Sequence, residues 1–155
     1  MRRCVLVLCV VMVFVPARTL RAQGAPTEDS LKLAHQTLMS AISSGNPAMM
    51  KPVLHRNGVG FLRDSQMIVQ LGGSFGPEEA IPLVLADLGR FSSATYESVF
   101  RVVGTTGVVC VAINFQPKKG EKAPPRFVRG TWTYAYLDGA WRLLSWHSSD
   151  IPLKK

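Results

Sequence analysis

The stretch YLDGAWRLLSWHSSD, from Tyr136 to Asp150, contains the clearest structural signal of the chain. Asp138-Gly139 is a strong signal for a tight hairpin turn. Alternating residues after it predict a strand from Trp141 to Ser149, antiparallel to a strand from Phe127 to Leu137. Because the last strand carries two tryptophans, three serines and a histidine, it is either a strand that closes the core or one wall of a pocket.

The rest of the chain changes from helical to strand-like periodicity near Ala94. Apolar spacing predicts an amphipathic helix from Ser30 to Ser44, and Asn46-Pro47 starts a second helix that Pro52 makes short or kinked. The other expected elements are a short strand over Val59–Arg63, a third helix from Pro77 or Pro82 to about Leu88, and strands over Tyr96–Val103 and Val108–Phe115. Helices followed by strands predict an α+β fold, with the N-terminal helices packed in the concave face of a strongly curved antiparallel sheet.

The N-terminus is typical of a secretory signal peptide over residues 1–24. A basic start is followed by an apolar run over Cys4–Val15 and by the small residues of Ala22-Gln23-Gly24. The apolar run is short for a membrane span, which needs about 20 residues. We therefore expect an exported protein, periplasmic or extracellular, with a single domain over residues 25–155 and no stable membrane span after cleavage. The alternative is a protein that keeps this segment as a membrane anchor.

Charge and cysteine content argue against several classes of partner. The formal net charge is +8, but four arginines and no acidic residue lie in residues 1–24, so the rest of the chain carries +4. This modest excess does not indicate a nucleic-acid partner. Cys110 is the one cysteine after residue 24, and its apolar neighbours predict a small buried side chain. No spacing of cysteine and histidine indicates a metal site, and no motif indicates a cofactor.

Strand alternation divides the aromatic and polar residues between two faces. It places Trp141, Leu143, Ser145, His147 and Ser149 on one face of the last strand, and Trp132, Tyr134 and Tyr136 on one face of the strand before it. In the strand over Val108–Phe115, the bulky residues Val109, Val111, Ile113 and Phe115 form the expected core. The smaller set, which includes Cys110 and ends at Asn114, is expected to line a cavity or face a partner.

The ending Asp138–Ser149 and the stretch Leu38–Ala48 resemble the SnoaL-like branch of the nuclear transport factor 2-like (NTF2-like) superfamily. The resemblance covers residues 27–151. It implies a cone-shaped domain whose open end is an apolar pocket with a few polar groups, and it makes a homodimer the expected state. Ketosteroid isomerase, dehydratases and polyketide cyclases share this superfamily with many members that only bind or assemble.

Five residues are candidate ligand contacts: Asn114, Trp132, Tyr134, Ser145 and His147. His147 is also the candidate catalytic residue, because an imidazole titrates near neutral pH, although a structural histidine explains it as well. His35, on the first helix, is expected to be exposed or at the rim of the pocket. Ketosteroid isomerase needs a carboxylate base and an oxyanion hole of a tyrosine and a protonated aspartate, and no such set stands out.

Two function hypotheses follow. The first is a noncatalytic module that binds a small apolar ligand or assembles. The alternative is a small hydrolyase, isomerase or cyclase acting on a hydrophobic carbonyl compound, with His147 as general base and Tyr134 or Asn114 as hydrogen-bond donor.

Overall fold

The computed structural model describes residues 25–61, 68–73 and 76–152, so the predicted signal peptide lies outside the described residues. Its elements, in chain order, are α1 (Glu28–Ser44), α2 (Pro47–Met50), a 3₁₀ turn (Lys51–Val53), β1 (Leu54–Phe61), β2 (Ile68–Gln70), α3 (Pro77–Leu88), β3 (Phe91–Val103), β4 (Thr106–Pro117), β5 (Arg126–Leu137) and β6 (Ala140–Asp150). Among the described residues, no helix is long and apolar enough to cross a membrane.

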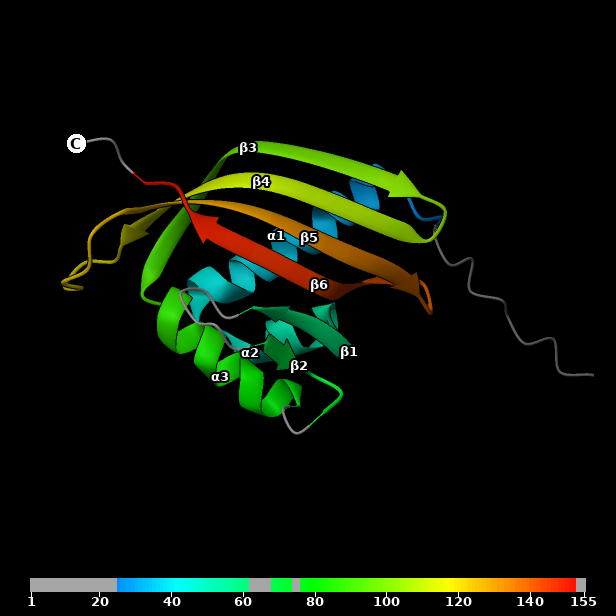
Figure 1. Cartoon of the computed structure of the whole chain (residues 1–155), viewed down its shortest axis with the longest axis horizontal. Helices are drawn as coiled ribbons and strands as arrows, with labels where there is room; N and C mark the ends of the chain where they lie inside the picture. Colours follow the sequence, from blue (N-terminus) through cyan, green and yellow to red (C-terminus); the bar gives the residue numbers. More distant parts are fainter. Residues whose placement is uncertain (1–24, 62–67, 74–75, 153–155) are drawn as a thin grey trace, which may run out of the picture.

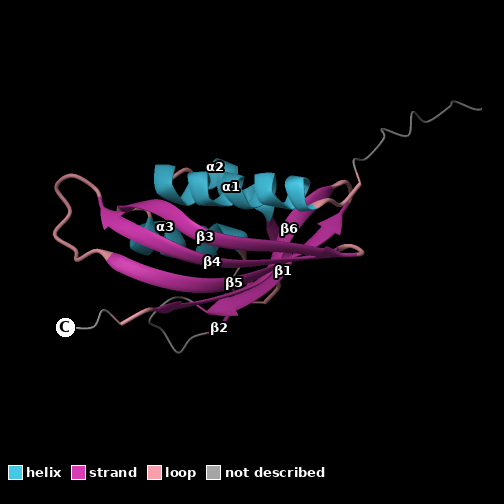
Figure 2. Cartoon of the chain, turned by 90° about the horizontal axis from the view of Figure 1, so that it is seen from above, coloured by secondary structure: helices cyan, strands magenta, loops and turns pink. Residues whose placement is uncertain are grey.

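The six strands form one sheet in the order β2-β1-β6-β5-β4-β3. Helices α1 and α2 lie along one face of this curved sheet, and α3 lies beside its β6 and β1 side (Figures 1 and 2). The predicted α+β class and the antiparallel run from β3 to β6 are confirmed. One pairing differs from the predicted antiparallel sheet, because β1 lies parallel to β6. A parallel pair needs a long crossover connection, and the chain between β1 and β6 supplies it.

Helix α1 packs its apolar stripe against the inner face of the sheet. Leu31, Leu38 and Ile42 on this stripe are at most 4% exposed. The helix begins at Glu28, two residues before the predicted start, because Thr27 and Ser30 form a reciprocal capping box. It ends at Gly45, whose φ of +67° is the left-handed conformation that glycine adopts without strain.

The segment between α1 and β3 departs most from the sequence prediction. The second helix is short, as predicted, and continues as a 3₁₀ turn at Pro52. The strand after it begins at Leu54, five residues earlier than predicted, and β2 was not predicted. Helix α3 begins at Pro77 and continues through Pro82. Tertiary contacts outweigh local propensity here, because Ala80 and Ile81, which directly precede that proline, are buried in the core.

A β-bulge changes the faces of β6. Thr133 pairs with Ser145 and Tyr134 pairs with Leu143, so Leu144 is an extra residue with no opposite partner. Because one extra residue reverses the alternation, Trp146 shares the inner face with Trp132, its partner across the ladder, and His147 turns to the outer face. The predicted single face for Trp141, Leu143, Ser145, His147 and Ser149 is therefore wrong after Leu143.

The inner face of β4 forms the centre of the core. Val109, Val111, Ile113 and Phe115 are at most 5% exposed, which confirms the predicted bulky set. Cys110 lies on the opposite face and is exposed, so the prediction of a buried thiol is wrong. The apolar run around it belongs to a strand with one solvent-facing side, and not to a strand buried on both faces.

Candidate functional site

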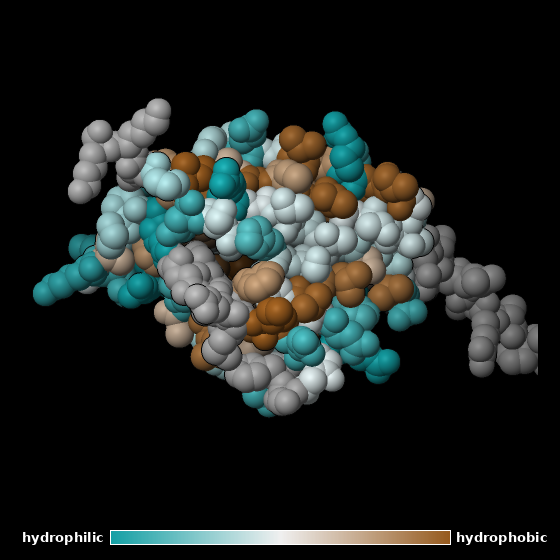
Figure 3. Space-filling model, in the orientation of Figure 1, coloured by the Kyte–Doolittle hydropathy of each residue, from teal (hydrophilic) through white to brown (hydrophobic). Residues whose placement is uncertain are grey.

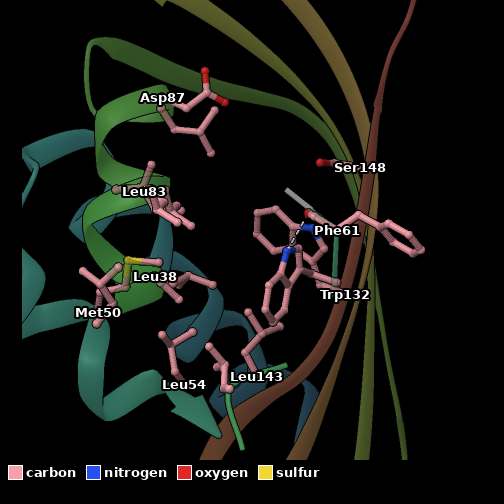
Figure 4. Close-up of a pocket in the computed structure, with 16 residues that line it drawn as sticks. Leu38, Met50, Leu54, Phe61, Leu83, Asp87, Trp132, Leu143 and Ser148 are labelled. Carbon is pink, nitrogen blue, oxygen red and sulfur yellow. Dashed lines mark hydrogen bonds between the residues drawn. The ribbon is translucent and has the colours of Figure 1, made fainter. Parts of the chain in front are cut away.

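A cavity of about 260 Å³ lies between α3 and the inner face of β5 and β6 (Figure 4). Its wall is almost entirely apolar and comes from α1, α2, α3, β1, β5 and β6. Side chains that surround the space include Leu38, Met50, Leu54, Leu83, Trp132 and Leu143. A space of this kind, with a few polar groups in an apolar wall, is the usual form of a small-molecule site.

Small residues on two paired strands shape the sheet side of this space. Gly130 on β5 pairs with Ser148 on β6, and both belong to the inner face. Farther along the same two strands, the inner face carries the buried side chains of Tyr134 and Trp141. The large residues fill the sheet–helix interface under α1. The indole of Trp132 lies over Gly130, and the small side chain of Ser148 lines the space under α3.

The cavity wall contains two indole groups with different hydrogen-bond states. Trp146 donates its Nε1–H to the carbonyl oxygen of Phe61 at 2.9 Å, which joins β6 to the end of β1. Trp132 is 8% exposed, and its Nε1 is buried without a partner among the described residues. The indole N–H of Trp132 is therefore a buried donor without an acceptor among the described residues.

Asp87, in the last turn of α3, is the ionisable side chain among the described residues of the wall. Its Oδ1 lies 3.8 Å from Nη1 of Arg126, whose Nη2 donates to Oδ2 of Asp150 at 2.7 Å. The side chain of Arg126 is 13% exposed, so its charge is only partly screened by water. The carboxylate of Asp87 consequently faces a compensating positive charge at this end of the cavity.

A buried histidine–tyrosine pair lies next to Trp132, on the side toward α1. Nδ1 of His35 and the hydroxyl of Tyr134 share a hydrogen bond of 3.0 Å, and the imidazole packs on the Trp132 indole at a ring distance of 4.6 Å. His35 is 3% exposed, so the prediction of an exposed or rim position is wrong. Its spacing of four residues from Leu31 places it on the buried stripe of α1.

Burial changes the proton equilibria of this pair. Desolvation disfavours the charged imidazolium and lowers the pKa of His35 from 6.5 to about 4. The same cause raises the pKa of the Tyr134 hydroxyl well above its usual range. Both groups are therefore uncharged at neutral pH, and a strong acid–base pair is absent from this place.

The structure brings one of the five candidate contacts, Trp132, to the cavity wall. Tyr134 is fully buried against His35. Asn114 lies on the outer face of β4 and accepts a hydrogen bond from Nε2 of Gln116 at 2.8 Å. Ser145 and His147 follow the bulge onto the outer face, where the imidazole meets the ring of Phe61 edge-on at 5.9 Å.

Sequence reasoning missed several residues of the wall. Alternation alone separates Trp146 and Ser148 from His147, and the cavity lies on the side of the tryptophan and the serine. No periodicity signals the extra residue at Leu144, so the sequence does not show which residues of β6 after Leu143 face the pocket. Asp87 and the apolar face of α3 were missed because the bounds of that helix were uncertain around Pro82.

The outer face of the sheet has a different character. A shallow hollow on it is lined by residues that include Glu97, Cys110, Arg129 and His147. The exposed apolar side chains of β3 and β1 include Val99, Val103 and Phe61. Figure 3 shows brown groups among pale and teal side chains on the face that it draws. No group of histidine, cysteine and acidic side chains that could hold a metal ion occurs within the described ranges.

Comparison with known proteins gives matches of structure without matches of sequence. No family model and no curated protein matches the chain. An NTF2-like protein from Cytophaga hutchinsonii superposes with a TM-score of 0.65 at 18% identity, over 81% of this chain and 99% of that one. The chain has the NTF2-like cone fold.

Two further NTF2-like neighbours show how widely this fold is used. A candidate dehydratase of the NTF2-like family from Streptomyces avermitilis has a TM-score of 0.68 at 14% identity, over 81% of this chain and 96% of that one. An NTF2-like protein of unknown function from Pseudomonas putida also has a TM-score of 0.68 at 14% identity, over 84% and 92%. At such identities the likeness establishes the NTF2-like fold and not the activity.

Proposed function

We propose that this NTF2-like domain is a noncatalytic binding module that takes a small apolar molecule into the cavity between α3 and the sheet. The observation that carries the proposal is the apolar wall around about 260 Å³ of space. Transfer of an apolar molecule from water into such a space is favourable in proportion to the area removed from water.

The described residues of the wall support binding more than catalysis. The cavity offers one carboxylate, Asp87, and this group faces Arg126. The guanidinium of Arg126 compensates the charge of this carboxylate. The imidazole of His147 lies on the outer face, so a catalytic role for His147 stays a prediction that would require a substrate on that face.

A pair of substitutions on neighbouring residues of β6 tests the proposed site. Ser148→Phe places a ring in the cavity, whereas Ser149→Phe places the same ring on the outer face. Titration with N-phenyl-1-naphthylamine, an uncharged fluorescent probe, is expected to show saturable binding to the wild-type domain. Ser148→Phe is expected to weaken binding roughly tenfold or more, since it fills the space that the probe needs.

Ser149→Phe and His147→Ala serve as controls and are expected to bind the probe with wild-type affinity. A wild-type domain that does not bind the probe would reject the proposal. Equal loss of affinity in Ser148→Phe and Ser149→Phe would place the probe elsewhere and reject this cavity as the site.

Three further expectations accompany this proposal. The C-terminal motif supports membership of the SnoaL-like branch, the sequence of residues 1–24 supports export, and the exposed apolar side chains of β3 support a homodimer. N-terminal sequencing of the mature protein checks export, and a full-length N-terminus would contradict it. Sedimentation velocity checks the homodimer, and a monomer would contradict it.

A further inference from the structure

We infer that the free edge of β3 is an interface at which a second copy of this chain pairs edge to edge and antiparallel, with the two-fold axis at Val99. The inference assigns the surface and the register of the expected homodimer. It does not rest on the cavity or on a ligand, so it is tested independently of the proposed binding function.

Strand β3 is long and lies at one edge of the sheet (Figure 1). Among the described residues its one strand neighbour is β4, and it has 13 residues, whereas the strand at the opposite edge, β2, has 3. An edge strand presents unpaired N–H and C=O groups, and a long apolar one is a template for another strand. Tyr96, Val99 and Val103 of β3 are 60%, 44% and 78% exposed. The edge of β3 therefore has the properties of a surface that pairs.

One hydrogen bond identifies the backbone groups that are accessible at this edge. Nη1 of Arg101 donates to the carbonyl oxygen of Phe100 at 2.7 Å. Because successive residues of an antiparallel strand direct their backbone groups to opposite sides, Ser98 directs its groups to the same edge as Phe100, and Val99 directs its groups to β4. A second copy centred on Val99 places its Phe100 opposite Ser98, so that groups accessible at both edges meet.

Charge complementarity selects Val99 as the centre of the pairing. A two-fold pairing of antiparallel strands brings together residues that lie equally far from the centre on either side. With Val99 at the centre, Glu97 of each copy lies opposite Arg101 of the other, which forms two pairs of opposite charge. Centring on Glu97 or on Arg101 would place like charges opposite each other, and centring on Ser98 or Phe100 would form neither charge pair.

Arg101 covers this edge in the single chain. Besides its bond to the carbonyl oxygen of Phe100, its Nη1 lies 3.6 Å from Oε1 of Glu28 on α1. The side chains of Arg101 and Glu28 are 70% and 54% exposed, and ion pairs at such exposure contribute little to stability. Arg101 can therefore exchange Glu28 for Glu97 of the second copy at little cost, which frees the Phe100 carbonyl for the second copy's backbone.

Two local features set the extent of the interface. The β3–β4 register shifts between Thr95 and Glu97, so the regular part of the edge begins at Glu97. On the inner side, a hollow between α1 and β3 is lined by residues that include Gln36, Ser40 and Ser98. This hollow leaves the inner side of the edge open beside α1, where an added strand would extend its floor.

Charge reversal tests the pairing, with the dissociation constant of the dimer measured by sedimentation velocity over a range of protein concentrations. Arg101→Glu and Glu97→Arg each create two like-charge contacts across the two-fold axis and are expected to weaken the dimer roughly tenfold or more. The double variant restores opposite charges and is expected to recover the wild-type dissociation constant. Thr131→Arg, on the exposed outer face of β5, is the control and is expected to leave it unchanged.

Disulfide trapping tests the register directly. Val99→Cys is made together with Cys110→Ser, because Cys110 lies opposite Val99 in the β3–β4 ladder. At the two-fold axis the two Val99 positions form a non-hydrogen-bonded pair with Cα atoms about 4.5 Å apart, which suits a disulfide. Val103→Cys in the same background is the control. Val103 is more exposed than Val99, but in this register its two copies lie about 26 Å apart. Oxidation is expected to link Val99→Cys and not Val103→Cys.

The results that would overturn the inference are distinct from those that bear on the ligand cavity. A wild-type chain that stays monomeric, equal linking of the two cysteine variants, or a double charge variant as weak as the single ones would each reject the edge pairing. A dimer that is lost in Thr131→Arg and kept in Arg101→Glu would place the interface on the outer face instead. Absence of N-phenyl-1-naphthylamine binding would reject the proposed function and leave this interface standing, because β3 contributes no residue to the cavity wall among the described lining residues.

Discussion

Replacing Gly60 by alanine is expected to lower the free energy of unfolding by about 3 kcal/mol. A Cβ atom at this position would overlap Cδ2 and Cε2 of the Trp146 indole, far inside van der Waals contact. Gly60 pairs with Trp146 across the parallel β1–β6 ladder, and the fused ring lies flat over the glycine. The indole is rigid, so it must move as a whole and give up its hydrogen bond to Phe61.

Chemical denaturation checks this prediction, and Gly73→Ala is the matched control. The nearest atom to a Cβ at Gly73 is 3.6 Å away, which is ordinary contact, so little change in stability is expected there. The clash should also depend on its partner. In a Trp146→Ala background, Gly60→Ala is expected to cost much less than in wild type. Additive losses in this double-mutant cycle would contradict the structural account.

The displaced indole also connects this prediction to the site. Trp146 lines the cavity, and any movement away from Gly60 brings it toward the empty space. Gly60→Ala is therefore expected to weaken binding of N-phenyl-1-naphthylamine as well as stability.

Acidification from pH 7 to pH 4 is expected to remove about 3 kcal/mol of stability through His35 alone. The pKa of His35 is about 4 in the folded protein and 6.5 when the chain is unfolded. Between these values the unfolded state binds a proton that the folded state does not, so stability falls as the pH falls. The contribution is complete above pH 6.5 and is lost progressively down to about pH 4.

The groups that surround His35 explain why the folded protein resists this proton. The imidazole contacts Tyr134, Trp132 and Phe100, none of which carries a negative charge that would stabilise an imidazolium. Urea denaturation at several pH values, with wild type and His35→Gln compared, measures the effect. His147→Gln, on the exposed outer face, is the matched control and should keep the wild-type dependence. A pH dependence that is unchanged in His35→Gln would contradict the assignment.

His35 also limits what the site can do at low pH. Its ring packs directly on Trp132, a residue of the cavity wall. Charging the imidazole would disturb this packing, so ligand affinity is expected to decrease in the same pH range as stability.

Several parts of the fold were predictable from local signals. Asp138-Gly139 predicted the final hairpin, and alternation predicted the β3–β6 run and the buried face of β4. These features depend on turn chemistry and on a period of two residues, which act over short distances along the chain. The parallel β1–β6 pairing was not predictable in this way, because it joins segments about 85 residues apart in the chain, as in the bond from Trp146 to Phe61. Strand β2 lies close to β1 in the chain, but its 3 residues are too few to show a period of two.

The sequence by itself determined that this chain has an α+β fold with an antiparallel C-terminal sheet, and that Trp132 and Tyr134 share one face of it. Only the tertiary structure decided which polar groups meet at the cavity. Because of the bulge at Leu144, the inner face carries Trp146 and Ser148 in place of His147. The packing of α3 places Asp87 on the opposite wall of the cavity. The physical reason is that one extra residue in a strand reverses every side chain after it at little local cost, so the choice is made by packing across the sheet.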